Sequence, residues 1–303
     1  MKNRFLLAAA ALLIAAPAQA AVVKLAVMAG QSNLIGGWPV PYSPQYADSL
    51  VKLYPDLTIW IDQSSDMRED EYPAGDDVAM PRFAQSIDRT PQNLGPVTHS
   101  ARGLGGTMTG PEVQFGRLLQ ARYGVAQKIA LVKFAIGGTS LNRHWLNPRK
   151  VNLSDQLLIA LAQIKQQIEQ AGDTVQFEGF AWIQGTSDAG SEEDAVKYLA
   201  NLRTLRSKVR DFVGNPKLPF VIEHTSIDFT KLSAQDAARM TEPLAIVNKA
   251  QRDFVTEDKC AAIVRMERFA HGDAVHFDPA AYYSIGQAFY FGHTQILQRA
   301  ECR

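Results

Sequence analysis

Three residues near the two ends of the sequence could together perform nucleophilic catalysis: Ser32, Asp273 and His276. A serine hydroxyl is a weak nucleophile at neutral pH and needs a base to take its proton. His276 is a candidate base, and Asp273 could orient its imidazole ring. Each residue alone has a common structural explanation, because a serine after a strand is usually a turn or cap residue. A serine hydrolase is therefore predicted only if other features bring the three together.

Acyl transfer also requires hydrogen-bond donors for the negative charge that develops on the substrate oxygen. The backbone N–H groups of Ser32 and of Gly137 or Gly138 could supply them, as could the side-chain amide of Gln184. Each of these residues lies where an apolar stretch of strand length ends. Because the carboxyl ends of parallel strands meet at one edge of a sheet, we expect the nucleophile and the donors to lie together there.

The elements that must position these residues alternate between strands and helices. We predict strands at 22–30, 128–136, 177–183, 218–222 and 261–264. We predict helices at about 112–124, 154–171, 191–213, 243–256 and 279–297, and a short strand or hairpin within 50–61. This alternation favours a mostly parallel α/β sheet with helices on both faces. The polar stretch at 62–110 is typical of a functional surface loop.

Four segments resemble the SGNH hydrolases, in the variant found in carbohydrate esterase family 6 and the sialate O-acetylesterases. They are Gly30-Gln31-Ser32-Asn33, Gly137-Gly138-Thr139-Ser140-Leu141 with Trp145, Trp182-Ile183-Gln184-Gly185-Thr186-Ser187-Asp188, and Asp273-Ala274-Val275-His276-Phe277, which 282–286 continue. They occur in order over nearly the whole chain after residue 20. The resemblance implies a three-layer α/β/α, flavodoxin-like fold and removal of O-acetyl groups from sugars without a metal or other cofactor.

The resemblance also implies roles for single residues. Ser32 is the nucleophile, His276 the base and Asp273 its partner, while Gln184 takes the oxyanion role that an asparagine plays elsewhere in the superfamily. One residue departs from the family pattern, because Thr186 stands where the family has a glutamate. Threonine cannot carry that charge, so the pocket differs in shape and polarity and the substrate could be an unusual one.

Residues beside these segments are candidates for binding the substrate. They are Gln31, Asn33, Arg143 and Trp145, with Trp38 and His144 as further residues that could line a sugar subsite. An aromatic ring offers an apolar face to a sugar, although ordinary packing is the alternative for both tryptophans.

Other polar residues have structural explanations that we favour. Glu112 is predicted to cap a helix, and His224 to have a structural role. Asp188 could orient the Gln184 turn or cap the helix that starts at 191, and we favour the cap. A metal held by His271 together with Asp273 and His276 is conceivable, but it would leave the serine segment unexplained, so we predict no metal site.

Composition and the N-terminal sequence indicate an exported protein. Residues 1–20 have a positive start, an apolar centre at 5–16 and the small-residue site Ala18-Gln19-Ala20, as a signal peptide does, which leaves 21–303 as a single domain. No later stretch is long and apolar enough to cross a membrane. The 31 basic and 31 acidic residues suggest neither nucleic-acid nor membrane-surface binding. We expect a periplasmic or secreted location, while the oligomeric state is left open.

The chain has two cysteines, Cys260 and Cys302, which are not spaced as a zinc site. In an exported protein such a pair often forms a disulfide, so we predict that they are bonded.

Together these features predict a serine esterase that removes acetyl groups from a carbohydrate, either a xylan-type glycan or sialic acid. Two alternatives stay open. One is an SGNH lipase or arylesterase that acts on other acyl esters, and the other is a sugar-binding module that has lost catalysis. The presence of Ser32, Asp273 and His276 argues against the module.

Overall fold

The computed structural model describes residues 20–37, 110–147 and 152–303, and the backbone of short strands at 58–64, 92–93, 99–100 and 107–108. The predicted signal peptide up to residue 19, Trp38 and most of the 62–110 stretch lie outside the described residues.

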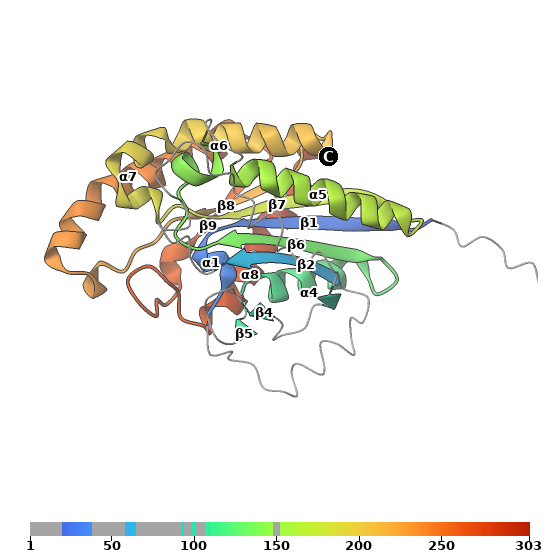
Figure 1. Cartoon of the computed structure of the whole chain (residues 1–303), viewed down its shortest axis with the longest axis horizontal. Helices are drawn as coiled ribbons and strands as arrows, with labels where there is room; N and C mark the ends of the chain where they lie inside the picture. Colours follow the sequence, from blue (N-terminus) through green and yellow to red (C-terminus); the bar gives the residue numbers. More distant parts are fainter. Residues whose placement is uncertain are drawn as a thin grey trace, which may run out of the picture.

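A sheet with the strand order β3-β2-β6-β1-β7-β8-β9 runs through the middle of the molecule (Figure 1). Neighbouring strands are parallel except for the pair of β2 and β3, which is antiparallel. The strands are β1 (Val22–Gly30), β2 (Thr58–Ser64), β3 (Gln92–Asn93), β6 (Ile129–Ile136), β7 (Thr174–Ile183), β8 (Phe220–His224) and β9 (Ala261–Arg265). Strands β4 (His99–Ser100) and β5 (Thr107–Met108) form a separate antiparallel pair.

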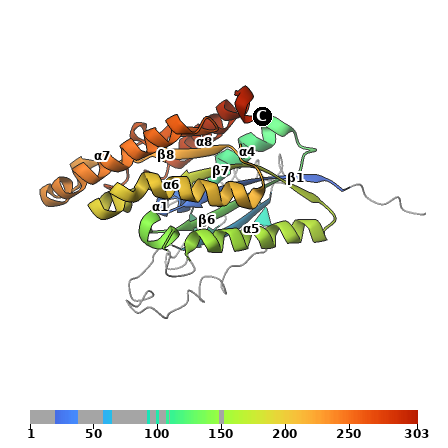
Figure 2. The same cartoon turned by 90° about the horizontal axis from the view of Figure 1, so that it is seen from above.

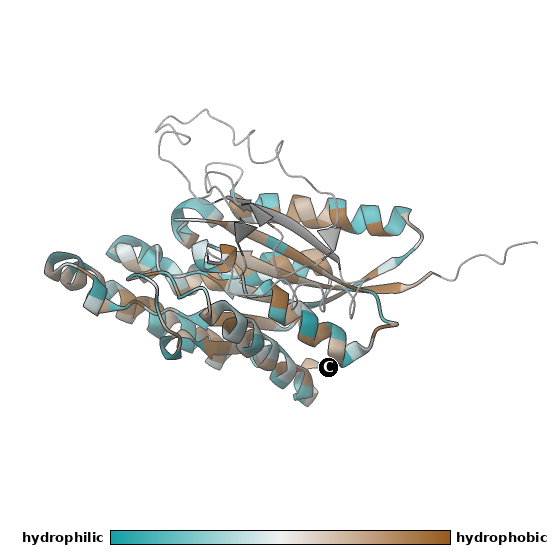
Figure 3. Ribbon diagram, turned by 90° about the horizontal axis from the view of Figure 1, so that it is seen from below, coloured by the Kyte–Doolittle hydropathy of each residue, from teal (hydrophilic) through white to brown (hydrophobic). Residues whose placement is uncertain are grey.

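Helices cover both faces of the sheet (Figures 1 and 2). One face packs against α5 (Leu153–Gln170), α6 (Glu192–Val213) and α7 (Ala234–Glu257). The other packs against α1 (Ser32–Ile35), α4 (Glu112–Tyr123) and α8 (Ala281–Gln298). The helices carry both hydrophilic and hydrophobic stretches, as expected where one side lies on a sheet and the other faces water (Figure 3). This arrangement confirms the predicted three-layer α/β/α fold.

Alternate residues of β1 supply two different cores. Leu25 and Val27 belong to the core under α5, α6 and α7, whereas Ala26 and Met28 belong to the core under α4 and α8. Successive side chains of a strand point to opposite faces, so a strand covered on both sides must be apolar throughout. That requirement explains the apolar run from Leu25 to Ala29, which leads to Ser32 at the end of the sheet.

Helix α7 begins earlier than predicted. It starts at Ala234, and Pro243, which we took for the first turn, lies inside it. Ser233 caps the helix by accepting a hydrogen bond from the Asp236 N–H at 3.1 Å. The prediction was wrong because proline favours the first turn of a helix, whereas this cap lies ten residues upstream of it.

The predicted disulfide is confirmed: Cys260 and Cys302 are bonded, with their Cα atoms 5.5 Å apart. Cys260 immediately precedes β9 and Cys302 follows α8, so the bond attaches the C-terminal segment to the sheet. Within the described residues, no helix combines the length and apolar character that a membrane span needs.

Candidate active site

The structure brings Ser32, His276 and Asp273 into one hydrogen-bonded chain. Ser32 Oγ lies 2.9 Å from His276 Nε2, and His276 Nδ1 lies 2.8 Å from Asp273 Oδ2. Ser32 is the first residue of α1 and is separated from β1 by Gln31 alone, while the other two lie in the loop between β9 and α8. With Nδ1 donating its proton to the carboxylate, Nε2 is an acceptor for the serine hydroxyl. This is the geometry in which a histidine can take the serine proton.

Asp273 also holds its own loop in shape. Its second oxygen, Oδ1, accepts from the backbone N–H groups of Val275 at 2.8 Å and of His276 at 2.7 Å. Partial burial raises the pKa of Asp273, but the hydrogen bonds from His276 and Val275 outweigh this effect and lower it below its ordinary value. The carboxylate is therefore ionised at neutral pH and can stabilise a positively charged imidazole.

Asn33 ties the serine segment to the histidine loop. Its Nδ2 donates to the Val275 carbonyl at 2.9 Å, and its Oδ1 accepts from the Phe277 N–H at 3.4 Å and the Tyr282 hydroxyl at 3.2 Å. The side chain is buried. The sequence predicted that Asn33 contacts the substrate, whereas in the structure its amide joins the start of α1 to the loop that carries His276.

The ends of the three central strands lie side by side, as predicted. Gly30 of β1 is opposite Ala135 of β6 and Ile183 of β7. A Cβ atom at Gly30 would lie only 2.0 Å from the Ile183 carbonyl oxygen, so the close approach requires glycine. Gln31 is also buried, and its Oε1 accepts from the N–H groups of Gly185 and Ser187, both at 3.4 Å. Gln31 thus connects two turns of the site, and this role replaces the predicted substrate contact.

Backbone donors for an oxyanion are present at this edge. The N–H of Ser32 is the first of α1, a position with no acceptor inside the helix. Gly138 is exposed and has φ +68°, a left-handed conformation that favours glycine. Gly137 precedes it and is buried. Gly138 therefore offers the more accessible of the two predicted glycine donors.

Gln184 is placed differently from the prediction. It is fully buried, and its Nε2 donates to the Thr139 carbonyl at 2.9 Å and to Asp188 Oδ2 at 2.5 Å. Since an amide nitrogen has two protons, both are in use. In this arrangement Gln184 joins the turn after β7 to the turn after β6, and no proton of its side chain is left for an oxyanion.

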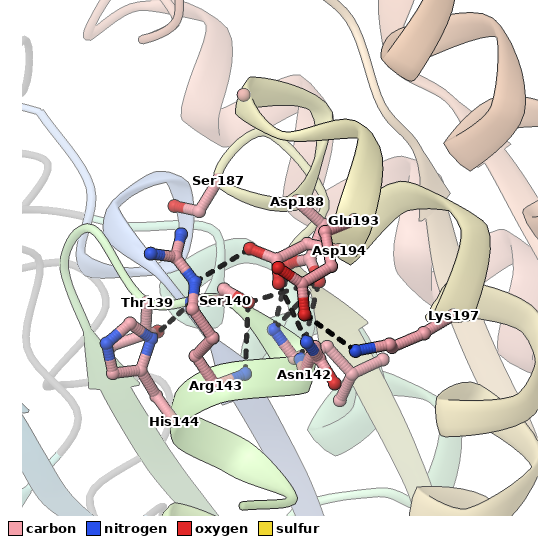
Figure 4. A network of polar contacts seen from close by, with 12 residues as sticks. Thr139, Ser140, Asn142, Arg143, His144, Ser187, Asp188, Glu193, Asp194 and Lys197 are labelled. Carbon is pink, nitrogen blue, oxygen red and sulfur yellow. Dashed lines mark hydrogen bonds and ion pairs between the residues drawn. The ribbon is translucent and has the colours of Figure 1, made fainter.

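Asp188 lies within a network of polar contacts (Figure 4). Gln184 donates to this residue from the turn after β7. The Asp188 carboxylate also accepts from the Ser140 hydroxyl at 3.3 Å, the Leu141 N–H at 2.9 Å and the Asn142 N–H at 3.4 Å. We expected Asp188 to cap the helix that starts near residue 191, and this prediction was wrong. The backbone N–H groups that it binds lie after β6, and the sequence does not reveal that they are close. Burial raises the pKa of Asp188 to about 6, hydrogen bonds from Gln184 and Leu141 oppose the rise, and Asp194 adds to it.

Comparisons with known proteins identify a family for this chain. The family model for carbohydrate esterase, sialic acid-specific acetylesterase, matches residues 22–291. The chain belongs to this family. That family is one of carbohydrate esterases, the class of enzyme that the sequence predicted. Curated protein sequences include no significant match.

Solved structures show the same fold at low sequence identity. XAC1771, a carbohydrate acetylesterase from Xanthomonas citri, has a TM-score of 0.60 at 15% identity over 90% of this chain and 56% of its own. A protein from Arabidopsis thaliana has a TM-score of 0.60 at 16% identity, over 90% of this chain and 98% of its own. NanS has a TM-score of 0.59 at 13% identity, over 92% of this chain and 99% of its own. This chain thus spans little more than half the length of XAC1771.

Trp145 is part of the core, so its predicted contact with the substrate is wrong. It is completely buried, its Nε1 donates to Thr139 Oγ1 at 3.0 Å, and its ring packs edge-on against Trp182 with centroids 4.7 Å apart. His144 is partly buried, and its Nδ1 accepts from the Ser140 N–H at 2.8 Å. Arg143, in contrast, keeps 59% of its side chain exposed.

The metal alternative finds no support in the placement of His271. Its ring packs against Phe277 with centroids 4.5 Å apart, and its Nε2 lies 3.4 Å from the Ser226 carbonyl. Among the described residues, no group of three metal-ligating side chains converges. His224 Nδ1 lies 3.4 Å from Glu267 Oε2 and its Nε2 lies 3.0 Å from Arg252 Nη1, in keeping with the structural role predicted for it.

Sequence reasoning missed a buried ion pair that supports α1. Lys133 Nζ lies 2.9 Å from Glu112 Oε2, both side chains are fully buried, and Lys133 also donates to the Ile35 carbonyl at 2.9 Å. Glu112 accepts from the Gly110 N–H at 3.2 Å, so it does serve the start of α4 as predicted. A lysine inside the apolar strand β6 was the available signal, because a buried lysine needs a partner.

Proposed function

We propose that this esterase removes O-acetyl groups from a sugar by serine catalysis, with O-acetylated sialic acid as the first candidate. The observation that carries the proposal is the hydrogen-bonded chain from Ser32 through His276 to Asp273. The family description supports the choice of sugar. Thr186, which stands where the family has glutamate, is buried. This difference is a reason to test other acetylated glycans in addition to sialic acid.

The first half of the reaction forms an acetyl-enzyme. Ser32 Oγ attacks the carbonyl carbon of the acetyl group while His276 Nε2 takes the hydroxyl proton. The carbonyl oxygen becomes an oxyanion that the N–H groups of Ser32 and Gly138 stabilise. The bond to the sugar oxygen then breaks, and His276 returns its proton to that oxygen. Asp273 holds the ring and stabilises its positive charge throughout.

The second half releases acetate. The deacetylated sugar leaves, and a water molecule takes its place beside His276. The histidine removes a proton from this water, which attacks the acetyl carbon bound to Ser32. Collapse of the second tetrahedral intermediate returns the proton to Ser32 Oγ and frees acetate.

Acetate release from a panel of substrates tests the proposal. The panel contains O-acetylated sialic acid, acetylated xylan, p-nitrophenyl acetate and a p-nitrophenyl ester with a long acyl chain. We expect fast release from at least one acetylated sugar, poor turnover of the long chain, and loss of activity in Ser32→Ala with unchanged unfolding. A preference for the long-chain ester would indicate a lipase. Sugar binding without any turnover would indicate a binding module.

We further propose that the protein is exported. The charged and apolar pattern of residues 1–20 supports this, as does the disulfide between Cys260 and Cys302, a bond typical of oxidising compartments. N-terminal sequencing of the protein from fractionated cells tests the proposal. A mature chain that starts at Ala21 outside the cytoplasm is expected, and an uncleaved chain in the cytoplasm would refute it.

A further inference from the structure

We propose that Arg143 binds a carboxylate of the acetylated sugar, so that the enzyme selects acidic over neutral sugars. The inference rests on the proposed function, because it assigns a specificity determinant to the same active site.

Arg143 stands at the rim of the catalytic edge. It lies in the π-helix Leu141–Trp145, which follows the Gly138 turn at the end of β6. The β6 end neighbours the β1 end that carries Ser32. Short π-helical segments are frequent at functional sites.

The turn after β7 borders the same rim. Ser187 of this turn donates its N–H to Gln31, the residue before Ser32. The guanidinium of Arg143 lies on the same side of the polar network as the Ser187 hydroxyl (Figure 4). A group bound to Arg143 would therefore sit beside the turns that frame the nucleophile.

The guanidinium is held in place from behind. Its Nε donates to Asp194 Oδ2 at 2.8 Å, and the other oxygen of Asp194 accepts from Asn142 Nδ2, also at 2.8 Å. Asp194 is 1% exposed, whereas the Arg143 side chain is 59% exposed. A buried carboxylate thus orients an accessible cation. This differs from a flexible surface arginine, which would lose more conformational freedom on binding.

The free end of Arg143 matches a carboxylate. Among the hydrogen bonds of the described residues, only Nε of its three nitrogens has a partner. The two Nη atoms retain four N–H donors, and a planar guanidinium binds both oxygens of a carboxylate through parallel hydrogen bonds. Neutral sugars offer hydroxyl groups, which do not gain from the charge.

The charged groups around Arg143 do not prevent an anion from binding to it. Glu193 is paired with Lys197 at 2.9 Å, so the second acidic side chain near Arg143 is already neutralised. Burial and the nearby Arg143 charge lower the pKa of His144 to about 4, although Asp194 and the Ser140 backbone oppose this shift. His144 is therefore neutral at pH 7, and the cation that meets the substrate at this point is Arg143.

The test compares two substrates that differ only in the carboxylate. We would measure acetate release from O-acetyl-N-acetylneuraminic acid and from its methyl ester, which keeps the acetyl group but loses the negative charge. The wild-type enzyme should prefer the free acid by about 10–100-fold in kcat/KM, mainly through KM, as expected for charge-assisted hydrogen bonds. Raising the ionic strength should reduce this preference.

Variants of Arg143 then assign the preference to this side chain. Arg143→Gln should bring the acid and the ester to nearly equal kcat/KM, because it lowers kcat/KM for the acid by a much larger factor than for the ester. Arg143→Lys, which keeps the charge but not the planar fork, should retain part of the preference. Arg203→Gln is the matched control, because Arg203 is also an exposed arginine paired with an acid, Glu257. It lies on α6 beyond Asp194. This variant should leave the preference unchanged.

Three results would overturn the inference. If the wild-type enzyme releases acetate equally fast from acid and ester, no carboxylate is recognised, although the proposed function would stand. If Arg143→Gln lowers acetate release from the acid and from the ester equally, Arg143 has a structural role. If the Gln variant folds poorly, Arg143→Lys replaces it in the test, and an equal loss of both rates in the Lys variant leads to the same conclusion. If no acetylated sugar is hydrolysed at all, the proposed function fails and this inference fails with it.

Discussion

Replacement of Asp273 by asparagine should harm catalysis more than replacement by alanine. The reason lies in the two backbone hydrogen bonds that Asp273 Oδ1 accepts, at 2.7 and 2.8 Å. An asparagine would keep them only with its oxygen in that position, which turns its NH₂ group toward His276 Nδ1. The ring would then accept at Nδ1 and carry its proton on Nε2, so it could not take the proton of Ser32.

The expected magnitudes follow from the exposure of the pair. Asp273 is 59% exposed and His276 44%, so water can partly replace the carboxylate once it is removed. For Asp273→Ala we expect the low end of a charge-assisted hydrogen bond, about 1.5 kcal/mol or roughly tenfold in kcat. For Asp273→Asn the wrong tautomer adds to this loss, and we expect about 10²–10⁴-fold, the upper value being that of a buried serine-protease triad.

Steady-state kinetics on p-nitrophenyl acetate measures both variants, and urea unfolding checks their stability. Both should remain folded, although alanine also removes a cap of the loop, at a cost of about 1 kcal/mol. An asparagine variant that retains more activity than the alanine variant would refute the argument about the tautomer.

Three further outcomes are expected. Gln184→Ala should lower the free energy of unfolding by about 1–3 kcal/mol, because it leaves Thr139 O and Asp188 without their buried donor; a 10²–10³-fold loss of kcat at full stability would instead show a direct oxyanion role. Burial raises the pKa of Glu223 to about 8, so its contribution to stability is complete below about pH 4.5 and declines as the pH rises through 8. The wild-type free energy of unfolding should therefore fall between pH 5 and 9, and in Glu223→Gln this fall should be smaller by a few kcal/mol. An unchanged pH dependence in the variant would show that Glu223 does not cause the fall. Reduction of the Cys260–Cys302 bond should cost about 3–4 kcal/mol in the chain-entropy model, measured by urea unfolding with and without reductant; equal stability would show that the denatured chain gains little freedom.

The features of the protein that depend on local sequence could be predicted. The apolar runs of β1, β6 and β7 end in glycine-containing turns, and strands covered on both faces leave few alternatives to such sequences. Their parallel arrangement places the turns at one edge, so the meeting of Ser32 with His276 could be anticipated although 244 positions separate them. The sequence by itself therefore determined the fold class, the disulfide, and which serine and histidine lie within hydrogen-bond distance at the edge of the sheet.

The orientation and burial of the other side chains were decided by the tertiary structure. Trp145 and Gln184 have residue types that suit binding and oxyanion stabilisation, yet both are fully buried and bonded to the Thr139 turn. Asp188 and Asn33 find their partners in backbone groups of distant turns. A residue type states which hydrogen bonds a side chain can make, but which of them it makes depends on the donors and acceptors that packing brings within about 3 Å.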